Sequence, residues 1–208
     1  MKLYYTPGAC SLGPHIALEW SGADYRTEAI PFADQRLKEI YPEGAGKVPI
    51  LDRENGLPPL TQSPAVLRYI ADRYPGAKIG SSDSVDELAD INRWLVFLSA
   101  DLHPVFHPVF VTERYTTDHS EEALESVASA ARILIRKELD VLERHLQGRI
   151  YIVGDSPTIV DAYAFPMLRW AQAKLPEKLE NTPNLQRLHD ALLADSGVQK
   201  VMQDEGLE

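Results

Sequence analysis

The pattern of apolar residues changes near residue 80, and this change constrains the fold more than any other feature of the chain. Before it, short apolar segments are separated by proline and glycine; after it, apolar residues recur every three or four positions over long stretches. The first pattern is typical of short strands and turns, and the second predicts amphipathic helices. Residues 75–83, which contain proline and glycine, are the best candidate for a linker. We therefore predict two domains, at residues 1–80 and 86–208.

The first part is predicted to have the order β-α-β-α-β-β-α. Asn55-Gly56 is a strong hairpin signal between the last two strands. Ser63-Pro64 starts the last helix, with serine as N-cap and proline at the first helical position. The predicted strands are at residues 2–5, 25–30, 48–52 and near 60, and the helices are at 11–21, 35–40 and from 63 onward.

The second part is predicted to be entirely helical. Ser84 with Glu87, and Thr158 with Asp161, have the spacing of capping boxes at helix starts. Further helices are expected at residues 120–146 and 184–194, followed by a short tail helix.

Composition excludes several classes of function. The net charge is −10 without a basic run, which does not favour binding to nucleic acid or to an anionic membrane. The apolar stretch at residues 94–111 is interrupted by aspartate, histidine and proline, so it is no membrane span. The single cysteine excludes an internal disulfide and a cysteine-rich metal site. Because the first residues show no apolar signal core, we expect a cytoplasmic protein.

Cys10 is the first candidate for chemistry. It lies where the first strand passes into the first helix, and unpaired amide groups and the helix dipole there favour a thiolate. We therefore expect a functional thiol with a lowered pKa. The alternative is that a lone cysteine is simply a small buried residue.

Two dipeptides are candidates for ligand binding. Val48-Pro49 opens a strand, where a cis peptide bond would expose the valine backbone to a ligand; the alternative is an ordinary proline at a strand start. Gln62-Ser63 lies at a helix N-terminus, which binds carboxylates well, although simple capping by Ser63 is the better interpretation from spacing alone.

His103 and His107 are four residues apart and would share one helix face. Two prolines in the same stretch and the lack of a carboxylate at a suitable spacing argue against a metal site. A kinked helix whose histidine reaches a binding site is the favoured interpretation, and a packed or solvated histidine is the alternative.

Four motifs in this order resemble bacterial glutathione S-transferases, close to the beta class, over essentially the whole chain. They are YYTPGACSLGPH at residues 4–15, GKVP at 46–49, QSPAV at 62–66 followed by YIA at 69–71, and SPTIVDA at 156–162. The resemblance implies an α/β thioredoxin-like N-terminal domain plus an all-α C-terminal domain, the glutathione S-transferase fold, as a homodimer. It also implies glutathione as co-substrate, no metal, and conjugation of the glutathione thiolate to a small hydrophobic electrophile.

The resemblance also implies roles for individual residues. Cys10 and His103 would lie at the glutathione sulfur, and Val48-Pro49 would be the cis-proline element whose valine backbone pairs with the cysteinyl part. The other expected glutathione-binding residues are Ser11 and Lys47, with Gln62 and Ser63 on the γ-glutamyl end. An apolar wall for the electrophile is expected from Phe106, Phe110 and Trp170. Thr158 and Asp161 would serve folding.

Three positions depart from the family pattern, at Gln62, Val96 and Pro104, and each replaces a polar group expected to contact glutathione. These departures give some weight to a non-enzymatic role, and Cys10 favours a second reaction, so two other functions stay open at this point. One is a glutathione-dependent thiol transferase or disulfide reductase that uses Cys10. The other is a non-enzymatic carrier of glutathione or a hydrophobic ligand.

Overall fold

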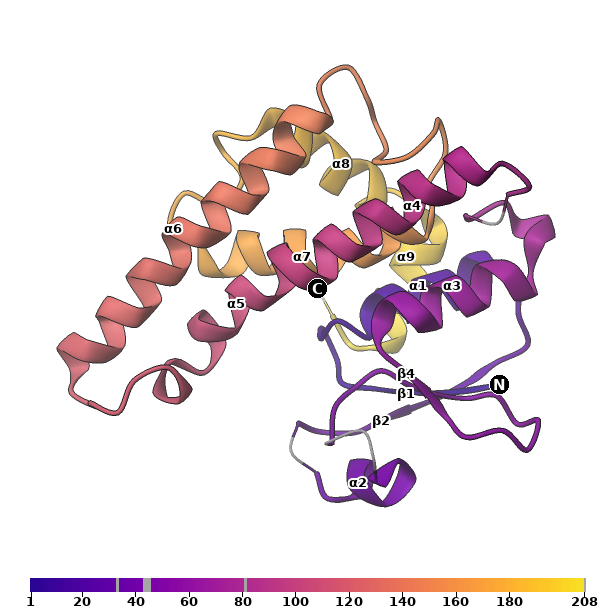
Figure 1. Ribbon diagram of the computed structural model, residues 1–208, viewed down its shortest axis with the longest axis horizontal. Coiled ribbons are helices and arrows are strands. Elements are labelled where there is room, and N and C mark those ends of the chain that lie inside the picture. The colour runs from indigo at the N-terminus through magenta and orange to yellow at the C-terminus, as the bar shows by residue number, and fades with distance from the viewer. Residues whose placement is uncertain (33, 43–45, 81, 208) are drawn as a thin grey trace.

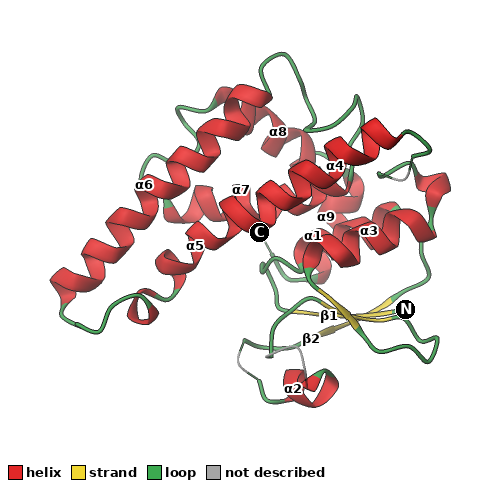
Figure 2. Cartoon of the chain, in the orientation of Figure 1, coloured by secondary structure: helices red, strands yellow, loops and turns green. Residues whose placement is uncertain are grey.

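The computed structural model describes residues 1–32, 34–42, 46–80 and 82–207. A small sheet with three helices forms the first part, and a bundle of long helices forms the second (Figures 1 and 2). The predicted order β-α-β-α-β-β-α is confirmed. The predicted linker at residues 75–83 includes Ser81, which lies outside the described residues.

Four strands form one mixed sheet in the order β2-β1-β3-β4. β1 pairs parallel with β2 and antiparallel with β3, and β3 pairs antiparallel with β4 across the loop that contains Gly56. This confirms the hairpin. The strands are β1 (Lys2–Tyr5), β2 (Arg26–Ala29), β3 (Ile50–Asp52) and β4 (Leu60–Thr61).

Alternating side chains of β1 pack into two separate hydrophobic clusters, one on each face of the sheet. Leu3 and Tyr5 of β1 are buried against α1 (Leu12–Trp20) and α3 (Ser63–Arg73), which lie between the sheet and the helical part (Figure 1). Tyr4 packs instead in a smaller cluster with Leu37 of α2 (Arg36–Ile40). This two-residue alternation is the periodicity of a β-strand covered on both faces.

The second part begins with α4 (Val85–Phe97), a π-helical turn at Leu98–Leu102, and α5 (His103–Phe110). Pro104 lies in the first turn of α5 and has no amide hydrogen to donate to the preceding turn. The backbone hydrogen bonds therefore change to the wider π spacing just before it. The predicted kink is thus a π turn directly ahead of His103. The remaining helices are α6 (Glu121–His145), α7 (Ile159–Lys174), α8 (Pro183–Leu193) and α9 (Ser196–Asp204).

The two predicted capping boxes have different outcomes. At α7, Thr158 and Asp161 form the complete box, and Asp161 also accepts a hydrogen bond from the Ile152 amide at 2.9 Å. At α4, Ser84 accepts the Glu87 amide at 3.3 Å, but the Glu87 carboxylate bonds to the Ser82 hydroxyl instead of returning to Ser84. Only the first half of that box forms.

Close packing of α1 on α7 joins the two parts. A Cβ atom on Gly13 would lie 2.9 Å from the Ala162 carbonyl oxygen and 3.0 Å from the Tyr163 Cα, so only glycine permits this approach. The contact places the middle of α7 directly beside the start of α1. It therefore determines which side chains of α7 can reach Cys10.

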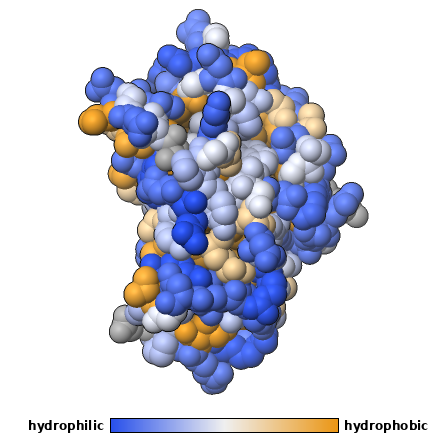
Figure 3. Space-filling view, turned by 90° about the vertical axis from the view of Figure 1, so that its right-hand side faces the viewer, coloured by the Kyte–Doolittle hydropathy of each residue, from blue (hydrophilic) through white to orange (hydrophobic). Residues whose placement is uncertain are grey.

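Hydrophilic residues cover most of the face shown in Figure 3. Among the helices of the described ranges, none is long and apolar enough to cross a membrane.

Candidate active site

Cys10 follows a tight turn between β1 and α1. The Ala9 amide donates to the Thr6 carbonyl at 3.0 Å, and Gly8 has φ +70° after Pro7, which is typical of a type II turn. The turn directs Cys10 toward the loop before β3, where its Sγ donates to the Val48 carbonyl at 3.5 Å.

The environment of Cys10 corrects the expected thiol chemistry. Burial raises the pKa of the Cys10 thiol to about 11, which outweighs the opposing influence of the Ser63 hydroxyl, the Cys10 and Ser11 amides and the Lys47 charge. The prediction of a lowered pKa was wrong because it considered the helix end and not the loss of water around the sulfur. At neutral pH this group is a thiol that donates a hydrogen bond.

Ser11, expected to bind glutathione, is committed elsewhere. Its side chain is completely buried, and its hydroxyl accepts from the Thr6 amide at 3.2 Å and donates to the Thr6 carbonyl at 3.3 Å. Because the hydroxyl hydrogen is already donated to Thr6 and the side chain has no exposed surface, this side chain stabilises the turn. The proposed contact between the Ser11 side chain and glutathione does not fit this arrangement.

The Val48–Pro49 peptide bond is cis, as the resemblance implied. Pro49 is buried and Val48 is half-buried, while the preceding Lys47 is exposed. The positive charge of Lys47 acts on Cys10, His103 and His107, so its ammonium group lies near all three. A ligand with a carboxylate beside Cys10 would find a counter-charge here.

Gln62 and Ser63 differ from the expected capping pattern. Gln62, not Ser63, is the N-cap of α3, and no side-chain capping bond forms. Gln62 has φ 69°, an unusual conformation for a residue with a side chain, and strain of this kind is common at functional sites. The buried Ser63 hydroxyl instead faces the site. Its hydrogen bonding favours the ionised forms of Cys10 and Tyr163 and so opposes part of the rise in pKa that burial causes in both. The positive end of the α3 helix dipole is therefore available to bind an anion.

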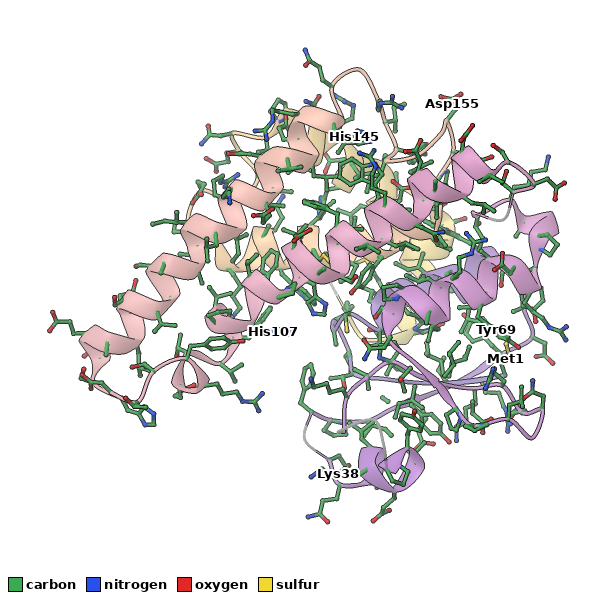
Figure 4. The ribbon with its side chains drawn as sticks, in the orientation of Figure 1. Met1, Lys38, Tyr69, His107, His145 and Asp155 are labelled. Carbon is green, nitrogen blue, oxygen red and sulfur yellow. The ribbon has the colours of Figure 1, made fainter. Side chains whose placement is uncertain are left out.

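His103 is half-buried on α5, and its Nδ1 lies 3.1 Å from the Tyr163 hydroxyl. Burial lowers the pKa of His103 to about 4, and the positive charges of His107 and Lys47 act in the same direction. The ring is therefore neutral at pH 7, with one nitrogen a donor and the other an acceptor. His107, four residues later, is exposed and lies on the side of α5 that faces the sheet (Figure 4).

Tyr163 of α7 is a site residue that the sequence analysis missed. It is only 2% exposed, and burial followed by the charge of Cys10 raises its pKa, so the hydroxyl keeps its proton. Its hydroxyl therefore contacts His103, and Ser63 and Cys10 are both close enough to affect its pKa. One signal was available, because Tyr163 is seven residues before Trp170 and shares its helix face.

The three expected wall residues have different places. Trp170 is half-buried, with its ring centroid 5.2 Å from that of His103 and 5.4 Å from those of Phe106 and Phe110. Phe110 is 44% exposed, whereas Phe106 is completely buried. Phe106 therefore supports the indole from beneath and has no surface for a substrate, which corrects its expected role. Of these three residues, Trp170 and Phe110 can present an apolar wall.

In the described part of the chain, no group of three or more His, Cys, Asp or Glu side chains is placed to hold a metal ion. The site instead gathers neutral hydrogen-bond donors at Cys10, Ser63 and Tyr163, a cation at Lys47, and an aromatic side. Such an arrangement suits a small anionic thiol ligand and an apolar reaction partner.

Comparisons with known proteins agree with this geometry. Residues 1–72 match the family model of the glutathione S-transferase N-terminal domain, and residues 98–195 match that of the C-terminal domain. The chain is 38% identical to glutathione S-transferase GST-4.5 of Xanthomonas campestris over the whole of both chains. It is 31% identical to a sphingomonad glutathione S-transferase solved in complex with glutathione, and covers all of both chains with a TM-score of 0.85. The bacterial beta-class enzyme of Sphingomonas chungbukensis is also 31% identical over all of both chains, with a TM-score of 0.86.

Proposed function

Because the chain belongs to the glutathione S-transferase family and is a glutathione transferase, we propose that Cys10 and His103 hold the glutathione sulfur while a small hydrophobic electrophile reacts against Trp170 and Phe110. In this reaction the sulfur of the glutathione thiolate forms a bond to the electrophilic carbon, and the leaving group departs with its bonding electron pair. The thiol proton passes to solvent before the attack.

The observation that carries this proposal is the 3.1 Å contact between the Tyr163 hydroxyl and Nδ1 of His103, in a site that also contains the Cys10 thiol. With a pKa of about 11 for Cys10 and about 4 for His103, both groups are neutral at pH 7. If Tyr163, which keeps its proton, donates to Nδ1, then Nε2 of His103 carries a hydrogen. Two neutral donors favour a thiolate between them and so lower the pKa of the glutathione thiol.

Glutathione binding would release the Cys10 donor. The Val48 carbonyl now accepts the Cys10 S–H, and the same backbone group is expected to pair with the cysteinyl part of glutathione. The γ-glutamyl carboxylate would lie at the start of α3, on Gln62 and Ser63, where the helix dipole is positive. The structure of the sphingomonad relative with glutathione supports glutathione as the co-substrate.

Thiol–disulfide exchange through Cys10 is the second candidate, since Cys10 is the single cysteine and lies beside the cis-proline loop. This reaction needs the Cys10 thiolate. A pKa of about 11 leaves roughly one thiol in ten thousand ionised at pH 7, which favours conjugation.

The proposal is tested by measuring turnover with two substrates, an aryl halide and a glutathionyl mixed disulfide. The wild type is compared with Cys10→Ser and Cys10→Ala. We expect aryl-halide turnover in the wild type, retention within about tenfold in Cys10→Ser, which keeps a donor, and a larger loss in Cys10→Ala. Exchange that is faster than conjugation and abolished in Cys10→Ser would contradict it.

We also propose that the enzyme works as a homodimer. Large apolar side chains are exposed on α4 and α6, at Val96 (58%), Ile133 (71%) and Leu134 (46%), and a two-fold assembly would cover such surfaces. Light scattering that gives the mass of one chain, 23.3 kDa, at micromolar concentration would contradict this.

A further inference from the structure

Gly8, in the turn that leads to Cys10, is held by two side chains of the helical part. Its amide donates to Oε2 of Glu205 at 2.9 Å, and its carbonyl accepts from Nε1 of Trp170 at 2.9 Å. In a type II turn these groups point outward and would otherwise bind water. Two helices far along the chain therefore hold the tip of this turn.

The base of the same turn is bonded within the sheet part. The Thr6 hydroxyl donates to the Ile30 carbonyl at 2.6 Å, and Ser11 bonds to the Thr6 backbone. The turn is thus fixed at its base by its own domain and at its tip by α7 and the end of α9. Movement of either helix would be passed to Cys10, two residues after Gly8.

Helix stability does not explain why a glutamate stands at position 205. It is the C-cap of α9, where the helix dipole disfavours a negative charge, and its side chain is completely buried. Its carboxylate oxygens are divided between two partners: Oε2 accepts from Gly8, and Oε1 lies 2.9 Å from Nδ1 of His15, itself completely buried. A residue that contradicts local preference in this way is expected where function requires it.

We propose that Glu205 is a positioning residue, which holds the Thr6–Ala9 turn so that Cys10 keeps its place relative to His103. The inference rests on the proposed function, in which these two groups flank the glutathione sulfur. Trp170 completes the connection, because its indole bonds to Gly8 while its ring packs 5.2 Å from His103. The end of the chain therefore determines the geometry at the reacting sulfur without touching the substrate.

Glu205→Ala, measured well below its unfolding midpoint, tests this proposal against a purely structural role. Asp204→Asn is the matched control, since it removes a neighbouring carboxylate that is exposed and pairs with Lys200 at the surface. In Glu205→Ala we expect kcat to fall about 10- to 100-fold. The KM for glutathione should change less than about twofold, because the groups proposed to bind its γ-glutamyl end and its cysteinyl backbone, at Gln62, Ser63 and Val48, lie on other segments. In Asp204→Asn both constants should stay within about twofold.

Alkylation of Cys10 gives a second readout that does not depend on turnover. Freed from the held turn, the thiol gains water, and its alkylation rate at pH 7 should rise about tenfold in Glu205→Ala and stay near the wild-type rate in Asp204→Asn. If the wild type shows no turnover, the proposed function fails. The alkylation rates still show whether Glu205 holds the turn before Cys10.

Wild-type values of both kcat and the alkylation rate in Glu205→Ala would overturn the proposal, even if its melting point is lower. If Glu205→Ala does not fold, Glu205→Asp takes its place. This variant keeps the charge, but one methylene less prevents it from reaching Gly8 and His15 together, so we expect smaller changes in the same directions. Unchanged rates in Glu205→Asp would overturn the proposal equally.

Discussion

The Cys10 thiol should react with an alkylating reagent more slowly than an ordinary cysteine, and its rate should keep rising up to about pH 11. Burial raises its pKa from the usual 9.0 to about 11. At pH 7 the thiolate fraction then falls from about one in a hundred to about one in ten thousand. The more basic thiolate is a stronger nucleophile, by roughly 6- to 10-fold over two pKa units, which offsets part of the loss. We therefore expect alkylation about 10- to 16-fold slower than in the unfolded chain.

Iodoacetamide and mass spectrometry of the peptide that contains Cys10 provide the assay, because Cys10 is the single cysteine of the chain. The same chain in denaturant gives the ordinary rate. Ser63→Ala should slow the reaction further, since the Ser63 hydroxyl lowers the pKa of Cys10. Ser21→Ala is the matched control, because its hydroxyl bonds to the Leu18 carbonyl and the Ala23 amide, at the opposite end of α1 from Cys10.

A rate that reaches its plateau below about pH 8.5 would refute the reasoning, because it would mean that the helix end and Lys47 outweigh burial. The proposed donor role of Cys10 would then fail as well.

Three further outcomes are expected. His103→Ala should lower kcat at saturating glutathione about 10- to 100-fold. Because burial holds the His103 pKa near 4, the wild-type pH–rate profile should show no histidine titration near pH 6.5. Normal turnover with only a lower melting point would remove His103 from the mechanism. Tyr163→Phe should lower kcat about 2- to 10-fold through the lost bond to His103. Kinetics equal to wild type would contradict this. Asp161→Ala leaves the Ile152 and Thr158 amides buried without their hydrogen-bond partner. We therefore expect the free energy of unfolding to fall by about 2–4 kcal/mol and the melting point by roughly 5–15 °C. An unchanged melting curve would argue against the capping box.

Local signals in the sequence predicted the order of the helices and strands. The Asn55-Gly56 hairpin and the box at Thr158 each depend on neighbouring residues, whose conformational preferences act within a few positions. Four motifs together identified the family, and with it the fold class that the comparisons confirm.

The roles of individual site residues were less predictable, because several depend on what lies across the domain boundary. Ser63 has the pattern of an N-cap, yet its hydroxyl turns toward Cys10 and Tyr163. Phe106 was expected in the apolar wall, yet it is completely buried and packs against Trp170. Sequence spacing gives the face of a helix but not what covers that face.

The sequence by itself determined the two-part organisation, the helix and strand order, the family and the place of Cys10 at a helix start. The tertiary structure decided the chemistry of that place. A sequence shows the charges and dipoles near a thiol, but desolvation depends on every segment packed around it, and here burial reverses the expected pKa shift of Cys10 and makes His103 neutral. Likewise only the packing of α1 on α7 at Gly13 brings Tyr163 to the site, and only the folded end of the chain brings Glu205 to Gly8, because contacts between distant segments leave no local signal in the sequence.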